Sequence, residues 1–181
     1  ARDGYLTDIL TDEALSFIDT DRTRPFLLTL AYNAPHSPLQ ATSAYLQRVA
    51  HIENPSERIY GAMVLALDDN VGRLLSALDE RGLSENTLVL FISDNGCPDY
   101  IGPNVCSNAP FRGFKAMYLE GGVRVPMIAS WPGRLPAGAV YDEPFVSFDW
   151  SRSILALAGA ETGDQVLDGI DILPLVVSDT A

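Results

Sequence analysis

Residues 88–97 read LVLFISDNGC, an apolar run that ends abruptly at a serine, an acid, an amide and a glycine. A short apolar run bounded by polar turn residues is typical of a buried β-strand. Ligands of open α/β sheets gather beyond the C-terminal ends of the strands, so Asp94 and Asn95 are well placed for chemistry. Their carboxylate and amide oxygens are donors that calcium and magnesium bind. Asp-Asn-Gly also suits an ordinary turn, so other residues must decide between the two interpretations.

Helix and strand patterns alternate on both sides of this segment, which predicts an α/β fold. The clearest helix lies at 56–80, where apolar residues recur at spacings of three and four and Arg81-Gly82 follows as a stop signal. The other expected elements are a helix at 7–20 capped by Thr7 or Thr11, a buried strand at 25–32, a strand at 87–93, a long loop from 96 to about 115, a strand within 125–133 and a helix at 148–159 closed by Gly159.

The charge balance excludes some classes of partner. Among 181 residues there are 24 acidic and 12 basic ones, which give a formal net charge of -12. Such a chain is poorly suited to nonspecific binding of nucleic acid or of anionic membranes, so we expect neither as a partner. No stretch has the length and apolarity of a transmembrane helix. Because the chain is so acidic, an anionic substrate would need a local cationic site.

Two cysteines, Cys97 and Cys106, lie nine positions apart in one loop rich in glycine, proline and asparagine. They could close a short disulfide-bonded loop in an oxidising compartment, or both could remain free thiols. Two cysteines do not complete a zinc site, and neither histidine stands at ligand spacing from them.

Five short motifs follow one another along the chain. They are PHSP at 35–38, SDNG at 93–96, RGFKAMYLEGGVRVP at 112–126, WPGRLPAG at 131–138 and LDGIDILPLV at 167–176. Each motif alone is weak, but in this order they resemble the later half of a sulfatase of the arylsulfatase type, in the alkaline-phosphatase-like superfamily. The resemblance covers almost the whole chain.

The resemblance implies a fold as well as an activity. We expect an α/β protein with part of the alkaline-phosphatase-like (sulfatase) fold, in which helices flank a mostly parallel or mixed sheet. Residues 1–181 would form a single domain, the C-terminal portion of a sulfatase catalytic domain. The half that carries the nucleophile and the small C-terminal subdomain would lie outside this chain.

The resemblance also assigns roles to four residues. Asp94 and Asn95 match the pair that ligates a divalent cation, for which we expect calcium in preference to magnesium. Lys115 matches a lysine that binds a sulfate oxygen, and its compact ammonium suits a tetrahedral anion. His36 matches a histidine near the leaving-group oxygen, where an imidazole can act as general acid. A histidine that merely caps the backbone between two prolines is the alternative for His36.

Other polar residues receive structural roles or none. Arg112, Glu120 and Arg124 match the motif as supports of the lysine loop, and the Gly-Gly step would allow close backbone packing. Consecutive helical positions point in different directions, so we interpret Asp68-Asp69-Asn70 as a solvated face and not as a second metal cluster. His51 has no motif around it and is expected on the surface.

The departures from the sulfatase pattern concern catalysis. Sulfatases oxidise a cysteine or serine in C/S-x-P-x-R to formylglycine, and neither Cys97 nor Cys106 begins that sequence. Segment 108–112 imitates it with Asn108 at the nucleophile position, where asparagine cannot become the aldehyde. FDWSRS at 148–153 replaces the usual Asp-Leu-x-Pro-Thr, which would change a helix start. We therefore expect formylglycine not to be encoded here and the isolated chain to be inactive.

The expected function is that of a sulfuric ester hydrolase portion, which contributes metal-binding and sulfate-binding residues and acts on a sulfate ester once completed. One alternative is an inactive remnant that serves as a folded binding module or self-associates through an exposed sheet edge. Another is a phosphonate or phosphate ester hydrolase of the same superfamily. Relatives are commonly exported, so the resemblance implies a periplasmic or extracellular parent enzyme.

Overall fold

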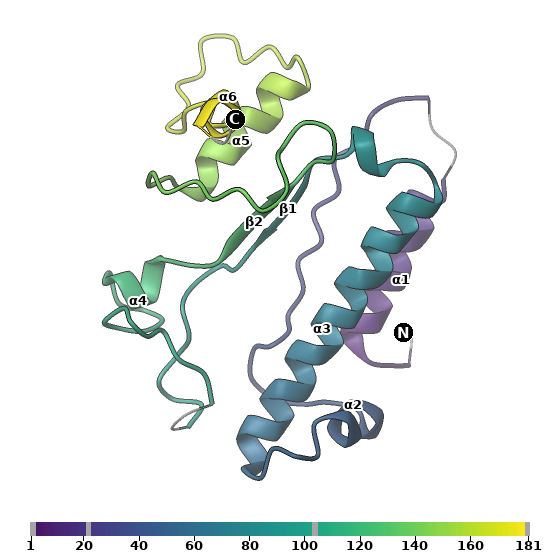
Figure 1. Cartoon of the computed structure of the whole chain (residues 1–181), viewed down its shortest axis with the longest axis vertical. Helices are drawn as coiled ribbons and strands as arrows, with labels where there is room; N and C mark the ends of the chain where they lie inside the picture. The colour runs from purple at the N-terminus through teal and green to yellow at the C-terminus, as the bar shows by residue number, and fades with distance from the viewer. Residues whose placement is uncertain (1–2, 21–22, 103–104, 180–181) are drawn as a thin grey trace. The chain divides into compact units, whose positions relative to one another are not determined.

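The computed structural model describes residues 3–20, 23–102 and 105–179 (Figure 1). The chain divides into two compact units, Ala1–Ser84 with Phe91–Ile128 and Glu85–Leu90 with Ala129–Ala181. The elements are α1 (Leu6–Ile18), α2 (Ser43–Arg48), α3 (Pro55–Glu80), the 3-10 turn η1 (Ser84–Asn86), β1 (Val89–Ile92), α4 (Glu120–Val123), β2 (Met127–Ser130), α5 (Ser147–Leu157) and α6 (Leu173–Asp179). None of the helices in the described part combines the length and apolarity that a membrane crossing needs.

Helix α3 confirms the prediction for residues 56–80. Asn54 caps its start by accepting hydrogen bonds from the backbone N–H groups of Ser56 (2.9 Å) and Glu57 (3.2 Å), and Pro55 occupies the first turn. The helix ends at Glu80 with Arg81 as its C-cap, and Gly82 follows with a φ of +64°, a left-handed conformation that glycine adopts without strain.

Helix α1 lies alongside α3 in the first unit (Figure 1). Both helices bury small residues, Ala14 in α1 and Ala62, Ala66 and Ala77 in α3. The predicted caps are wrong, because the N-cap is Tyr5 and both threonines lie inside the helix. Thr11 is fully buried, and its hydroxyl contacts the Thr7 carbonyl (2.9 Å) and the Tyr32 hydroxyl (2.7 Å).

Asn70 corrects the interpretation of residues 68–70 as a solvated face. Its side chain is fully buried in α3, whereas Asp68 is exposed. The Asn70 amide donates to the Asp8 carboxylate (2.7 Å) and to the Ala66 carbonyl (2.8 Å), and its oxygen accepts from Arg73 (2.8 Å). A buried amide needs such partners, and they come from α1 as well as α3, so Asn70 ties the two helices together.

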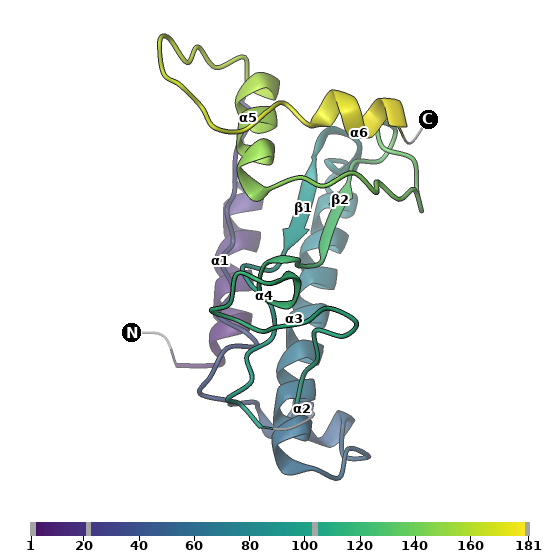
Figure 2. The ribbon, with the colours of Figure 1, turned by 90° about the vertical axis from the view of Figure 1, so that its left-hand side faces the viewer.

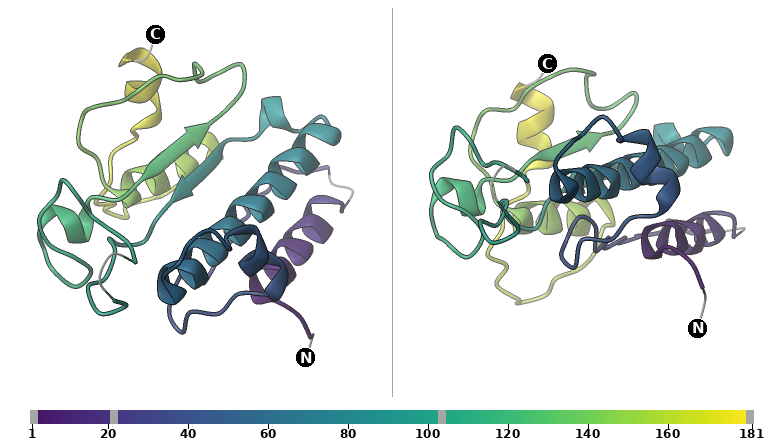
Figure 3. Two further views of the ribbon diagram at one scale, coloured as in Figure 1. Left: turned by 60° about the horizontal axis from the view of Figure 1, so that its bottom comes forward. Right: turned by 90° about the horizontal axis from the view of Figure 1, so that it is seen from below.

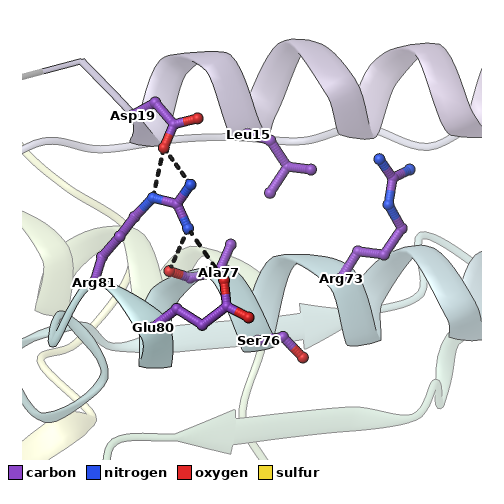
Figure 4. A pocket seen from close by; sticks show the side chains of 7 residues that line it. All are labelled: Leu15, Asp19, Arg73, Ser76, Ala77, Glu80 and Arg81. Carbon is purple, nitrogen blue, oxygen red and sulfur yellow. Dashed lines mark hydrogen bonds and ion pairs between the residues drawn. The ribbon is translucent and has the colours of Figure 1, made fainter.

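Ion pairs border a groove between the same two helices (Figure 4). Arg81 follows α3 and donates to the carboxylate of Asp19, which follows α1, through both Nε (2.6 Å) and Nη2, and also to the Ala77 carbonyl. Further along, Arg73 pairs with Asp12 at 2.6 Å. These guanidinium groups are engaged in holding α1 to α3.

Helix α2 packs against α3 (Figure 3). A bidentate pair between Arg48 and Asp69 links the two helices. The hydrogen bonds from Arg48 stabilise the charged carboxylate and lower the pKa of Asp69 below its ordinary value. A depressed pKa in the folded state contributes stability above the unfolded pKa, and that stability is lost as pH falls through the folded pKa.

We therefore expect Asp69→Asn to lower the melting temperature of the chain slightly near neutral pH, by about 1–2 °C since the pair is largely exposed. The difference from the unsubstituted chain should shrink as pH falls from about 4 through the lower pKa of the folded state, where the native carboxylate becomes protonated too. Thermal melts followed by circular dichroism between neutral and acidic pH would check this. A difference that stays constant across the range would contradict it.

Strands β1 and β2 confirm two predicted strands and form a two-stranded sheet. The Ser93 N–H donates to the Pro126 carbonyl (3.3 Å) and the Gly96 N–H to the Gly122 carbonyl (3.0 Å), so the strands run antiparallel (Figure 3). The prediction that β1 is a buried strand is wrong, since Phe91 is 38% and Ile92 43% exposed. With two strands in the described sheet, each has a single hydrogen-bonded neighbour.

The strand predicted at 25–32 is not formed among the described residues. The backbone there carries no regular strand assignment, and side chains alternate between half-buried and exposed. Leu27, for example, is 68% exposed. The apolar pattern suits a strand, but a strand also requires a hydrogen-bonding partner, and the described chain supplies none to this segment.

Helix α5 confirms the helix predicted at 148–159, and Gly159 follows it with a φ of +62°. Residues 167–172 of the motif return to this helix and the rest of the motif begins α6, all within the second unit (Figure 2). Gly169 makes the approach possible, because an added Cβ atom would overlap the Phe148 carbonyl group.

Two buried polar side chains of α5, four positions apart, hold the returning segment. The Asp149 carboxylate accepts from the backbone N–H groups of Val146 (2.8 Å) and Ile170 (2.9 Å). The Ser153 hydroxyl donates to Asp171 (2.7 Å) and accepts from the N–H groups of Ile172 (2.9 Å) and Leu173 (3.1 Å). The FDWSRS segment thus fixes the chain that follows, a role beyond the altered helix start predicted from the sequence.

Candidate active site

Lys115 and His36 lie together although 79 positions separate them in the sequence. The Lys115 ammonium nitrogen is 3.0 Å from Nε2 of His36. Lys115 is the only lysine in the sequence, so this contact employs the chain's single ammonium side chain. Both residues belong to the first unit. The sequence named these two residues from different motifs, and the fold brings them together.

The hydrogen bonds of His36 define its tautomer. Its Nδ1 lies 2.7 Å from the carbonyl oxygen of Ser37, which can only accept, so Nδ1 carries a proton. In the neutral imidazole, Nε2 is then an acceptor for the ammonium of Lys115. The backbone contact is the capping role considered as the alternative for His36, and the ring makes it while also reaching Lys115.

Asp94 and Asn95 follow β1 and lie side by side. The amide nitrogen of Asn95 donates to the Asp94 carboxylate, and the Ser93 hydroxyl donates to the Asn95 carbonyl (2.9 Å), which fixes the turn. A half-turn of the Asn95 amide would present its oxygen beside that carboxylate. The contacts therefore join the four predicted residues as two pairs, Lys115 with His36 and Asp94 with Asn95.

The donor set at the end of β1 fits part of a site for a hard cation. One carboxylate and one amide oxygen are ligands that calcium and magnesium accept, but calcium takes about six to eight oxygens. Among the described residues, no group of three or more histidine, cysteine, aspartate or glutamate side chains could hold a metal ion. A cation at this position would need further oxygens from water or from other protein segments.

The Gly-Gly step confirms the predicted close backbone packing beside Lys115. A Cβ atom on Gly121 would lie 2.9 Å from the carbonyl oxygen of Arg112 and closer still to that of Gly113. One on Gly122 would overlap the carbonyl oxygen of Met117. The Gly121 N–H also donates to the Arg112 carbonyl at 2.9 Å. Only glycine leaves room for these contacts.

The charged residues around this step have the supporting contacts expected from the sequence. Glu120 pairs with Arg124 one helical turn later (3.1 Å), and the Arg124 guanidinium stacks over the ring of Phe111 at 4.6 Å. Arg112 takes part through its backbone carbonyl. Ala116, directly after Lys115, has a φ of +75°, a conformation that costs about 1–2 kcal/mol for a residue with a side chain.

The structure decides the pairing of the cysteines that the sequence left open. Cys97 and Cys106 form a disulfide with their Cα atoms 6.0 Å apart. The bridge closes the loop that follows Asp94 and Asn95. His51, expected on the surface, is exposed.

Sequence reasoning missed the role of Asn108. Its oxygen accepts from the Cys97 N–H (2.7 Å), and its nitrogen donates to the carbonyls of Cys97 (2.9 Å) and Gly113 (3.1 Å). The sequence indicated only that this residue is an unsuitable nucleophile. An asparagine in a loop rich in glycine and proline could have indicated this role, because its side chain can form the hydrogen bonds that backbone groups form.

Residues 130–134 also have the letters of C/S-x-P-x-R. Ser130-Trp131-Pro132-Gly133-Arg134 has serine, proline and arginine at the required spacing. Ser130 is an exposed residue at the end of β2, in the second unit. The Arg134 guanidinium stacks over the Trp131 ring at 4.6 Å, and the buried indole donates to the Glu85 carbonyl (3.0 Å). These contacts give Trp131 and Arg134 a structural role.

Comparison with known proteins decides the family. The family model described as Sulfatase matches residues 1–160. The chain belongs to the sulfatase family. This sulfatase chain is 42% identical to steryl-sulfatase of Mus musculus over 97% of its own length and 28% of that protein. It is 41% identical to N-acetylgalactosamine-6-sulfatase of Canis lupus familiaris over 97% of its length and 33% of that protein.

Solved structures confirm the partial sulfatase fold. This sulfatase chain superposes on Ps i-CgsB, crystallised in complex with k-i-k-neocarrahexaose, with a TM-score of 0.93 and 38% identity, over 98% of the chain and 40% of that structure. The PsFucS1 sulfatase from Pseudoalteromonas sp. matches with a TM-score of 0.81 and 32% identity, over 94% and 34%. The sulfatase chain thus spans about a third of the relatives that it matches.

Proposed function

We propose that this chain is the later portion of a sulfatase catalytic domain that hydrolyses a sulfate ester. In this proposal Lys115 and His36 bind the sulfate group, and Asp94 with Asn95 contributes to a divalent-cation site. The observation that carries the proposal is the 3.0 Å contact between Lys115 and His36, which joins two matched motifs from distant parts of the chain. The shares of 28% and 33% covered in the relatives support a larger parent protein.

The charges favour an anion at this place. The chain has a formal net charge of -12, yet its single ammonium group lies against an imidazole. A bound tetrahedral anion would replace the direct contact and accept hydrogen bonds from the Lys115 ammonium and from Nε2–H of a protonated His36. A protonated imidazole placed at the ester oxygen could then donate its proton to the leaving alkoxide or phenoxide. Lys115 would stabilise negative charge that builds up on the sulfate oxygens.

A divalent cation belongs to the proposal because sulfatases generally depend on one. We propose that Asp94 and Asn95 would hold it, with calcium preferred to magnesium, since two neighbouring side-chain oxygens suit a flexible shell of oxygen ligands. When bound, such an ion would supply Lewis-acid polarisation of the sulfate group. The turn fixed by Ser93 keeps both side chains at the end of β1.

We place the nucleophile in a segment that precedes this chain, with formylglycine not encoded within residues 1–181. This agrees with the structural contacts of Trp131 and Arg134 and with the use of Asn108 as a hydrogen-bonding residue. The isolated chain would then bind sulfate without turning over an ester. A C/S-x-P-x-R segment in the coding sequence upstream of Ala1 would support this arrangement.

Sulfate binding by Lys115 is directly testable. The chain has one lysine and two histidines, so isotope labelling of these residue types gives few and assignable NMR signals. Titration with sodium sulfate should shift the side-chain signals of Lys115 and His36 and leave those of the exposed His51 unchanged. We expect Lys115→Met to raise the sulfate dissociation constant at least about tenfold, because it removes a charge-assisted hydrogen bond.

Sodium chloride at equal ionic strength is the control for screening. Equal shifts at His51 and His36, or unchanged affinity in the Lys115→Met variant, would contradict the assignment. A parallel titration with inorganic phosphate bears on the alternative, a phosphate or phosphonate ester hydrolase. Turnover of an aryl phosphate by the complete protein would favour that alternative. Self-association through the sheet remains a prediction. Ile128 in β2 is 61% exposed, so the sheet presents an apolar side chain to solvent.

A further inference from the structure

We propose that Asn108 is a positioning residue that holds Lys115 in register with the metal-binding end of β1. The inference rests on the proposed function, because it concerns how the sulfate-binding lysine reaches its place. Asn108 lies in the loop between the two motifs, and the hydrogen bonds of its side chain go to the backbone of Cys97 and Gly113. It acts through the backbone of the residues that flank Lys115 and Asp94.

The Asn108 side chain joins the two parts of the site. It makes two hydrogen bonds to the backbone of Cys97, two positions after Asn95, and one to the carbonyl of Gly113, two positions before Lys115. The amide therefore links the end of β1 to the start of the lysine loop. A side chain that bridges both segments determines how far apart they lie.

The carbonyl of Cys97 is the point where this bridge reaches Lys115. It accepts from the Asn108 amide at 2.9 Å and from the backbone N–H of Lys115 at 3.1 Å. Loss of the first bond would free the Cys97 peptide to move, and the second bond would then hold Lys115 less firmly. The Lys115 amide is therefore a direct reporter of whether Asn108 is in place.

Few side chains could replace Asn108 here. Its amide presents an acceptor to an N–H group and two donors to two carbonyl groups. Aspartate has the same shape, but it would turn a carboxylate oxygen toward the carbonyl oxygens of Cys97 and Gly113. Alanine would leave all three backbone groups without this partner. The disulfide between Cys97 and Cys106 keeps the Asn108 segment near its target.

The experiment compares three variants of the full chain labelled with ¹⁵N-lysine, which gives one backbone amide signal. We expect Asn108→Ala to increase hydrogen exchange of the Lys115 amide about tenfold or more and to raise the sulfate dissociation constant by a similar factor. Asn108→Asp should do the same while preserving side-chain volume. It also serves as the second variant if the alanine substitution impairs folding.

Asn70→Ala is the matched control. It also removes three hydrogen bonds from an asparagine of the first unit, but one of these bonds joins α3 to Asp8 of α1 and the other two lie within α3. It should lower the melting temperature and leave the Lys115 amide exchange and the sulfate affinity unchanged at a temperature where the chain is folded. This separates positioning of Lys115 from general destabilisation.

The positioning role would be overturned if both Asn108 variants kept the exchange rate within about twofold of the unsubstituted chain, or if Asn70→Ala altered it equally. Failure of the unsubstituted chain to bind sulfate would count against the proposed function. The exchange comparison would still decide the role of Asn108, because it requires no ligand. The two proposals therefore fail in distinguishable ways.

Discussion

Gly121→Ala is expected to destabilise the loop that carries Lys115 by more than about 3 kcal/mol. The new Cβ atom would meet the backbone of Gly113 and the carbonyl oxygen of Arg112, and backbone groups cannot move aside as the end of a flexible side chain can. The hydrogen bond from the Gly121 N–H to Arg112 would be lost with the displacement. Urea denaturation and hydrogen exchange at the Lys115 amide would measure the effect.

Gly72→Ala supplies the matched control for this prediction. Gly72 lies in the middle of α3, and an added Cβ atom there would meet no atom within 4 Å other than its chain neighbours and the nearby backbone of the helix itself. Alanine is the better helix former, so this substitution should raise stability by about 0.5–1 kcal/mol. If both glycine substitutions had similar effects, the argument from close backbone packing would fail.

Ser153→Ala is expected to cost about 2–4 kcal/mol of stability in the second unit. The fully buried hydroxyl satisfies two backbone N–H groups and one carboxylate, and alanine would leave the N–H groups of Ile172 and Leu173 without that partner. Ile172 is 1% exposed, so water cannot easily replace the hydroxyl there. Increased exchange at the Ile172 and Leu173 amides would locate the loss.

The same helix contains the control position for this experiment. Ser151 is exposed and lies two residues earlier in α5, so Ser151→Ala should change the free energy of unfolding by no more than about 0.5 kcal/mol. A small effect of Ser153→Ala, comparable with that of Ser151→Ala, would show that the returning segment is held mainly by its apolar contacts.

These two predictions distinguish the motifs that hold the backbone together from the motifs that supply the polar groups of the candidate site. The Gly-Gly step and the segment at 167–176 carry no reacting group, yet each brings backbone from distant positions into contact. Lys115, His36, Asp94 and Asn95 supply the charge and the oxygen donors of the candidate site. Substitutions in the Gly-Gly step or in the segment at 167–176 should therefore change stability. Substitutions of the four site residues should change ligand binding.

Features of the candidate site that depend on neighbouring residues could be predicted from the sequence. Contacts between residues far apart in the chain could not be predicted from local patterns. Asp94 and Asn95 could be placed after a strand because strand and turn patterns involve neighbouring residues. The contact between Lys115 and His36 spans 79 positions, and the resemblance to sulfatases, not periodicity, was what related them. The hydrogen bonds of Asn108 to the backbone of Cys97 and Gly113 followed neither from local sequence patterns nor from the resemblance, because no motif marks a side chain that bonds to distant backbone.

What the amino-acid sequence determined by itself was the α3 helix with its stop at Gly82, the strands at β1 and β2, and the family, through motifs in a fixed order. Periodicity and turn chemistry act over a few neighbouring residues and can be read directly from the chain. Only the tertiary structure decided that Asn70 is buried, that 25–32 is not a paired strand and that the cysteines are bonded. Burial, strand pairing and cross-linking require a partner from elsewhere in the chain, and local sequence does not specify where that partner lies.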